Sequence, residues 1–207
     1  MKLSNFLEST LTDLQCHFYE GSKNSGPTRV VGNFSEVFSF SGNENYCDSI
    51  SRSVGKNGRF SCNVEIVNCL NVPLRNRNQW YCNSNNTDFF PLEIQSFHRE
   101  SFLGSSDTNF EAMLSYEILS TDLALVIGLK VGPGNNSFAA AFSQIPAVSG
   151  KNELKALMNP SHGKIHDYKK YSKASKTLDI ISDRNIRAEI LMTEDEKSVL
   201  KIRIYAV

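Results

Sequence analysis

Hydrophobic side chains alternate with polar ones in five separate segments, and this period of two constrains the fold more than any other feature. The segments span residues 62–67, 113–118, 123–131, 186–191 and 200–205. Successive side chains of a β-strand point to opposite faces, so these segments predict strands with one buried face. Residues 119–122 and 193–197 are short enough to join neighbouring strands as hairpins. The predicted fold class is mainly β: an antiparallel β-sandwich flanked by one or two α-helices.

One helix is predicted inside the β-rich part, over residues 151–158. Leu154, Leu157 and Met158 form its apolar side. Asn159 and Pro160 end it, because a proline disfavours the helical conformation of the residue before it.

The first residues have a helical period instead. Their apolar side chains recur at steps of three and four, and they are Leu3, Phe6, Leu7, Leu11, Leu14 and Phe18. An isolated helix of this length is marginal in water, so we expect its apolar face to be covered. Two interpretations stay open: the helix docks on the main body or on a second copy, or it leaves the body and lies in a membrane.

Breaks in these patterns predict three regions. Residues 1–20 form the N-terminal amphipathic helix, and residues 59–207 form the β-sandwich domain. Residues 21–58 are a linker or irregular segment, because glycine, serine and proline are frequent in its first part. Within this segment we expect short extended pieces at 30–31 and 37–40 and a short helix at 45–54.

Charge is balanced overall but not along the chain. The 22 basic and 22 acidic side chains cancel, which argues against a chain that binds nucleic acid over its whole surface. Residues 151–207, however, carry 12 basic and 8 acidic side chains. Seven of the basic ones are lysines at positions 151, 155, 164, 169, 170, 173 and 176. This cluster fits either a solvated loop or a surface that meets phosphate groups.

Residue types that carry chemistry do not form a recognisable site. The five cysteines include no Cys-x-x-Cys pair, and His162 and His166 have only Asp167 as a neighbouring third ligand, so surface histidines are favoured over a metal site. No nucleophile elbow or phosphate-binding loop occurs, so we expect neither an enzyme nor a cofactor. Glu8 interrupts the stretch where a secretory signal needs an apolar run, which predicts reduced thiols in a chain that is cytoplasmic or released without a classical signal peptide.

Three stretches carry a resemblance to a known family: Arg59 to Asn68, Met113 to Gly128, and Arg187 to Ile204. The first looks like a strand that alternates valine or isoleucine around a glutamate and ends in asparagine. The second is similar to a Val-Leu-x-Tyr strand, a hairpin and a Leu-Ala-Val-Leu-Phe-Ser strand. In this order and spacing, residues 60–207 resemble the actinoporins, the pore-forming cytolysins of sea anemones.

The resemblance implies the sandwich fold and a route to function. In the family's lytic members, aromatic loops capture phosphocholine headgroups, and an N-terminal amphipathic helix inserts and lines an oligomeric pore. This chain departs from that pattern at the headgroup site. The family's Ser-Val-Pro-Tyr-Asp-Tyr word falls on the stretch that starts at Gly128, and its helix tyrosines fall near Lys155, Met158 and Asn159. The aromatic cage for a quaternary ammonium is therefore missing.

The predicted function is that of a membrane-binding protein of the pore-forming, cytolysin-like class. Its sandwich would dock on lipid, and its N-terminal helix, through the six apolar residues from Leu3 to Phe18, would insert or oligomerise. The expected lipid or ligand contacts are Lys130, Ser137, Phe138, Lys155, Tyr168, Lys169, Lys170 and Tyr171. The expected partner is membrane lipid with anionic or zwitterionic headgroups, or a glycan. We expect the protein to act as a homo-oligomer and not to bind nucleic acid. The alternative is a non-lytic glycan- or protein-binding module with a self-association helix.

Overall fold

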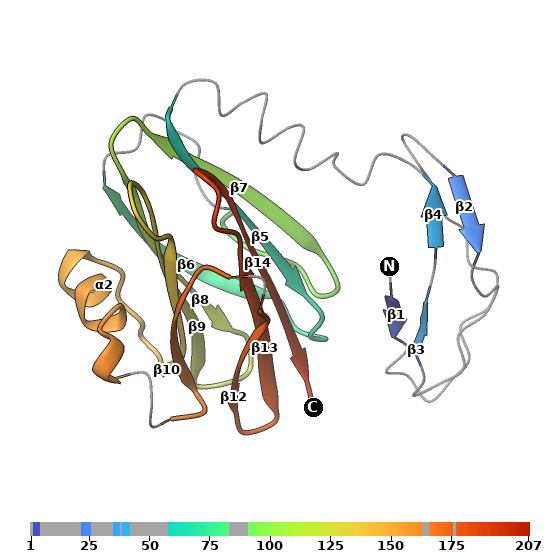
Figure 1. The fold of residues 1–207 in the computed structure, drawn as a ribbon. Helices are drawn as coiled ribbons and strands as arrows, with labels where there is room; N and C mark the ends of the chain where they lie inside the picture. The colour runs from blue at the N-terminus through green and yellow to red at the C-terminus, as the bar shows by residue number, and fades with distance from the viewer. Residues whose placement is uncertain are drawn as a thin grey trace. The chain divides into compact units, whose positions relative to one another are not determined.

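The chain forms two compact units, Met1–Ile50 and Ser51–Val207. The computed structural model describes residues 2–4, 22–25, 35–37, 39–41, 58–82, 91–162, 166–175 and 177–207. In the first unit, β1 (Lys2–Ser4) pairs with β3 (Ser35–Val37), and β2 (Ser22–Ser25) pairs with β4 (Ser39–Ser41), both antiparallel. Figure 1 shows these strands.

The predicted N-terminal helix meets the described residues only at its start. Leu3 lies in β1, a strand, where the apolar period predicted the beginning of a helix. The other predicted insertion residues, Phe6, Leu7, Leu11, Leu14 and Phe18, lie outside the described residues. The short helix expected at 45–54 and the extended piece at 30–31 also lie outside them.

The second unit is a β-sandwich, and its described part contains two five-stranded sheets (Figure 1). Its elements are β5 (Phe60–Asn68), β6 (Leu74–Cys82), β7 (Arg99–Ser106), β8 (Phe110–Ile118), β9 (Leu123–Val131), β10 (Ser137–Gln144), α2 (Lys151–Leu157), the 3-10 turn η2 (Pro160–His162), β11 (Lys169–Lys173), β12 (Asp179–Asp183), β13 (Ile186–Met192) and β14 (Lys197–Ala206). The five strands expected from the alternating segments, the helix and both hairpins are all present.

One sheet has the order β11-β10-β9-β8-β6 and is antiparallel throughout. The other has the order β12-β13-β14-β5-β7 and contains one parallel pair, β14 with β5. The alternation predicted antiparallel strands only, and this pair is the exception. In the second unit β5 is the first strand and β14 is the last, so no hairpin turn fixes their relative direction.

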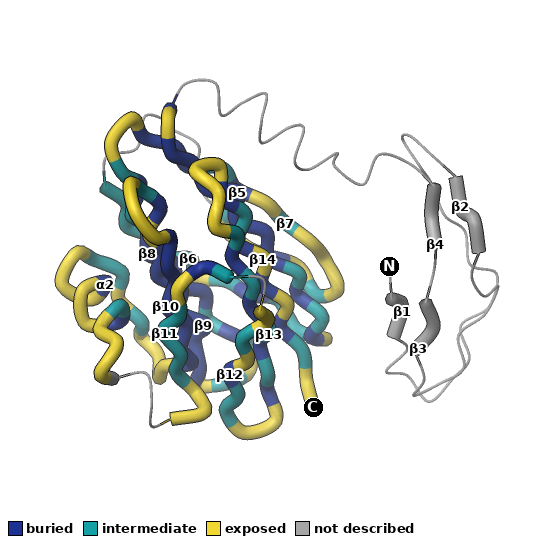
Figure 2. The backbone as a smooth tube through the Cα atoms, viewed as in Figure 1, coloured by how far each residue is buried: buried dark blue, intermediate teal, exposed yellow. Residues whose placement is uncertain are grey.

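The main core lies between the two sheets. Figure 2 shows the continuous burial of the central strands. The largest side chains that are almost fully buried are Tyr116, Phe60, Phe110 and Phe138. The Tyr116 hydroxyl donates a hydrogen bond of 2.6 Å to the carbonyl of Pro91, and burial raises the pKa of this phenol. A buried tyrosine needs such a partner, since an unpaired hydroxyl in the core costs free energy.

Strands β8, β9 and β10 are buried on both faces, which the period of two did not predict. Their outer faces carry Met113, Val126 and Ala139, which form a second apolar cluster with Leu154 and Leu157 of α2. Gly128 makes this close packing possible: a Cβ at this position would lie 2.7 Å from Cδ1 of Leu154. Trp80 also packs against this second cluster and is only partly buried.

Candidate functional site

A row of polar side chains crosses the outer face of the α2-bearing sheet. Lys130 on β9 is paired with Ser137 on β10, and Ser137 is paired with Lys173 on β11. Directly paired residues point to the same side of a sheet, and adjacent strands are about 4.8 Å apart. Both lysines are exposed, whereas Ser137 is buried between them. Two of the predicted contact residues are thereby brought together with Lys173, which belongs to the predicted lysine cluster.

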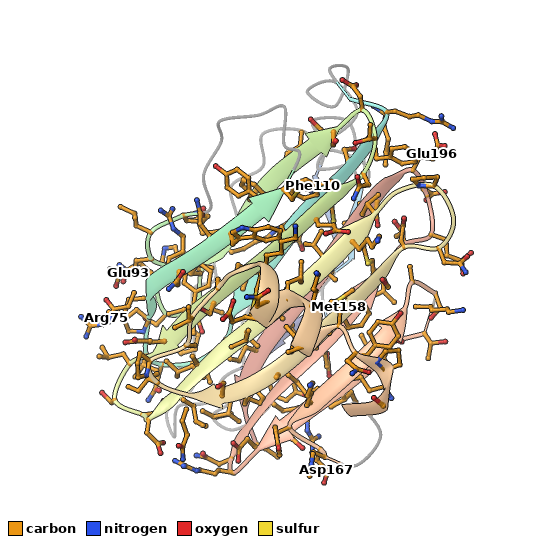
Figure 3. The ribbon with its side chains drawn as sticks, turned by 90° about the vertical axis from the view of Figure 1, so that its left-hand side faces the viewer. Arg75, Glu93, Phe110, Met158, Asp167 and Glu196 are labelled. Carbon is orange, nitrogen blue, oxygen red and sulfur yellow. The ribbon has the colours of Figure 1, made fainter. Side chains whose placement is uncertain are left out.

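Helix α2 adds two more lysines to the same side. Leu154 and Leu157 are buried against the sheet, so Lys151 and Lys155, one turn apart, extend to the exposed side of the helix. Figure 3 looks onto this side of the sandwich, with Met158 labelled just after α2. We call this surface the lysine face: the outer surface of the sheet β11-β10-β9-β8-β6 with α2, carrying Lys130, Lys151, Lys155, Lys169 and Lys173.

Two of the predicted contact residues on this face hold α2 in place. The Lys169 ammonium donates a hydrogen bond of 3.4 Å to the carbonyl of Ala156, at the C-terminal end of α2, where a cation is favoured by the helix dipole. Partial burial lowers the pKa of Lys169. Tyr171 packs partly buried against the second apolar cluster. These two side chains join β11 to the helix and are less free for an outside partner than Lys155 or Lys173.

Lys170 and Tyr168 lie at the edge of the sandwich. Lys170 follows Lys169 on β11 and so points to the opposite side, where its ammonium lies 3.3 Å from a carboxylate oxygen of Asp179. Tyr168 precedes β11, is 40% exposed, and stacks on His166 with ring centroids 4.9 Å apart. These residues therefore belong to the β11–β12 edge next to the lysine face.

Phe138 is not a surface residue. It is only 1% exposed and lies in the main core, because it neighbours Ser137 on a strand and so points to the other side of the sheet. A headgroup docked on the lysine face cannot touch this ring. The prediction of Phe138 as a lipid or ligand contact is therefore wrong, since the structure places this residue inside β10 with its side chain in the core.

The two outer faces of the sandwich differ in how their charges are arranged. On the other sheet, Arg99 pairs with Glu65 and Arg203 pairs with Glu189. On the lysine face Lys130 pairs with Glu111 at 3.0 Å, but Lys155 and Lys173 have no acidic partner among the described residues. Lys155 and Lys173 thus carry positive charge that no ion pair neutralises within the part of the protein that the structure describes, although α2 also carries the exposed Glu153.

The sequence analysis did not single out Leu178 and Ile180. Both are large apolar residues that stand about half exposed at β12. The signal was the adjacent pair of Ile180 and Ile181: on a strand, only one of two neighbours can face the core, so the other must face outward.

No known family description matches the chain, and no curated protein sequence matches it. Among solved structures, the lipid-binding protein Nakanori superposes with a TM-score of 0.57 at 10% sequence identity, over 78% of this chain and 79% of that chain. The two proteins share a fold. At this identity the likeness supports the predicted sandwich architecture, while membership of the actinoporin family stays a prediction.

The described residues give no support for a metal site, a reactive cysteine or a membrane-spanning helix. No group of three or more metal-ligating side chains occurs there. Cys62, Cys69 and Cys82 are free thiols, and burial raises the pKa of Cys62 to about 12, so this thiol is protonated and unreactive at neutral pH. Within the same ranges, no helix has the length and apolar character needed to span a bilayer.

Proposed function

We propose that this protein binds membrane lipid through the lysine face of its sandwich. The observation that carries the proposal is the clustering of five lysines on one outer face, where Lys130 alone has an acidic partner among the described residues. The shared fold with a lipid-binding protein adds support. We expect binding without catalysis.

The chemistry of this face favours anionic lipid over phosphocholine. Each lysine near an anionic surface contributes about 1 kcal/mol, and the attraction falls off within a Debye length. A quaternary ammonium would need an open aromatic cage. Tyr171 is engaged in packing against the second cluster, and Tyr168 stacks on His166 at the neighbouring edge, so neither offers a free wall for such a cage on this face.

Substituting the unpaired lysines tests this proposal. We expect Lys155→Ala and Lys173→Ala each to weaken binding to vesicles containing phosphatidylserine about fivefold, since each removes roughly 1 kcal/mol of attraction. Lys201→Ala is the matched control, because it removes the same charge from an exposed position on the outer face of the other sheet. Vesicle co-sedimentation measures the partition coefficients.

Equal losses at Lys155, Lys173 and Lys201 would show attraction by net charge alone and would contradict a defined binding face. The folded fraction of each variant is checked by circular dichroism, and little change is expected, because exposed lysines contribute little to stability.

We further propose that bound protein assembles and permeabilises the membrane through the N-terminal segment at residues 3–18. Its apolar residues recur with a helical period, and a helix with one apolar face is stable at a lipid interface. Wild-type protein should release a dye from phosphatidylserine vesicles, and a variant lacking residues 1–20 should bind these vesicles without releasing it. Equal dye release by both proteins would exclude the N-terminal segment as the cause.

A further inference from the structure

The sandwich has an edge where one sheet ends in β11 and the other ends in β12. The Ser182 N–H donates a hydrogen bond of 2.8 Å to the carbonyl of Asp167, and Lys170 lies 3.3 Å from Asp179. These two contacts place the strands side by side and antiparallel. Figure 3 labels Asp167 at this edge. We call this surface the β11–β12 edge.

Large apolar side chains project from this edge. Leu178 is 49% exposed and Ile180 is 50% exposed, while Ile181 between Ile180 and Ser182 is almost fully buried. Ile180 therefore points away from the core by the alternation of the strand. Tyr168, on the adjoining segment, is also substantially exposed. Edge strands are commonly protected by charged residues, so one exposed aliphatic residue on a short edge strand and a second just before it need a physical reason.

The same edge carries the lysines of β11. Lys169 and Lys173 face the lysine side, and Lys170 faces Asp179. The acidic residue nearest to Ile180 in sequence, Asp179, is neutralised by this ion pair and its side chain is largely buried. Exposed apolar groups thus lie beside the three lysines of β11, while Asp167 and Asp183 are the acidic side chains of this edge that form no ion pair among the described residues.

This combination is complementary to the interface of an anionic bilayer. Lysines meet the headgroups while aliphatic and tyrosine side chains enter the boundary between headgroups and acyl chains. Resting on the proposed function, we infer that the β11–β12 edge faces the membrane and inserts Leu178 and Ile180 into the interfacial layer. The protein then lies on its edge, with the lysine face adjoining the bilayer.

Removing the two side chains separates insertion from charge attraction. We expect Leu178→Ser combined with Ile180→Ser to weaken binding to phosphatidylserine vesicles on the order of tenfold, because about half of each side chain is available for transfer from water. The salt dependence should stay as in the wild type, since no charge is changed. Leu92→Ser combined with Phe97→Ser is the matched control, because both residues are more exposed than Leu178 and lie between β6 and β7, the strands at the other end of the two sheets.

A depth measurement gives an independent result. In the Ile180→Trp variant, brominated lipids should quench the fluorescence of the introduced tryptophan. In the Leu92→Trp variant, they should not quench it. Binding by the serine variant equal to the wild type, or no quenching at position 180 in bound protein, would overturn the inference while vesicle binding itself stands. Failure of wild-type protein to bind any vesicle would instead overturn the proposed function.

Discussion

Replacing Asn68 by aspartate is expected to lower the free energy of unfolding by about 4 kcal/mol or more, and replacing it by alanine by about 3 kcal/mol. The Asn68 side chain is fully buried at the end of β5. Its amide nitrogen lies 2.9 Å from the carbonyl oxygen of Val72, 3.2 Å from that of Ile94 and 3.0 Å from that of Gln95. Its amide oxygen accepts a hydrogen bond of 3.1 Å from the N–H of Leu70.

The test is whether the aspartate variant has a lower free energy of unfolding than the alanine variant. Alanine removes all four hydrogen bonds, although the carbonyls of Ile94 and Gln95 still accept from the N–H groups of Leu74 and His98. Aspartate places a charged oxygen against three carbonyl oxygens in a buried site, which costs more. Urea unfolding measures both values, and Asn152→Asp on the exposed side of α2 is the control, with a change under about 0.5 kcal/mol. An aspartate variant as stable as this control would show that the connection between β5 and β6 does not depend on Asn68.

Gly104 is the second position where a small change is expected to have a large effect. An ideal Cβ at this residue of β7 would overlap the ring of Phe110, which is itself fully buried. We expect Gly104→Ala to lower the free energy of unfolding by about 3 kcal/mol, because a close-packed core cannot absorb the added group without moving the ring or the strand. Thermal unfolding should show a melting temperature lower by roughly 10 °C.

A compensating substitution makes this prediction specific. The double variant Gly104→Ala with Phe110→Leu should lose less free energy of unfolding than the two single variants lose in sum. The smaller side chain at residue 110 leaves the space that the new methyl group takes. Gly134→Ala is the control: its φ of 110° strains any other residue, but no atom stands within contact of the added Cβ, so about 1 kcal/mol is expected. Purely additive effects at residues 104 and 110 would contradict the overlap.

The sandwich could be predicted from the sequence because alternation records which side chains face the core. Leu123, Leu125, Ile127 and Leu129 are all in the main core, as their spacing requires. Alternation does not record what lies over the other face. The second cluster under α2, which contains Val126 and Ala139, was therefore not predicted.

The candidate site was predictable in part. The lysines of residues 151–173 were identified by their density in the sequence, and α2 and β11 bring them to one face with Lys130. The prediction failed at Phe138 because this residue follows Ser137 in β10, so its side chain faces the main core. Leu178 and Ile180 were missed because residues 179–183 were not predicted to be a strand, and only on a strand does the adjacent pair of Ile180 and Ile181 require one side chain to face outward.

The most direct test of the central claim is a single comparison of vesicle co-sedimentation for wild-type protein. Vesicles containing phosphatidylserine should bind the protein at least tenfold more tightly than vesicles of pure phosphatidylcholine at 100 mM salt, and the difference should shrink as salt is raised. Equal binding to both vesicles, unaffected by salt, would contradict lipid recognition by the lysine face.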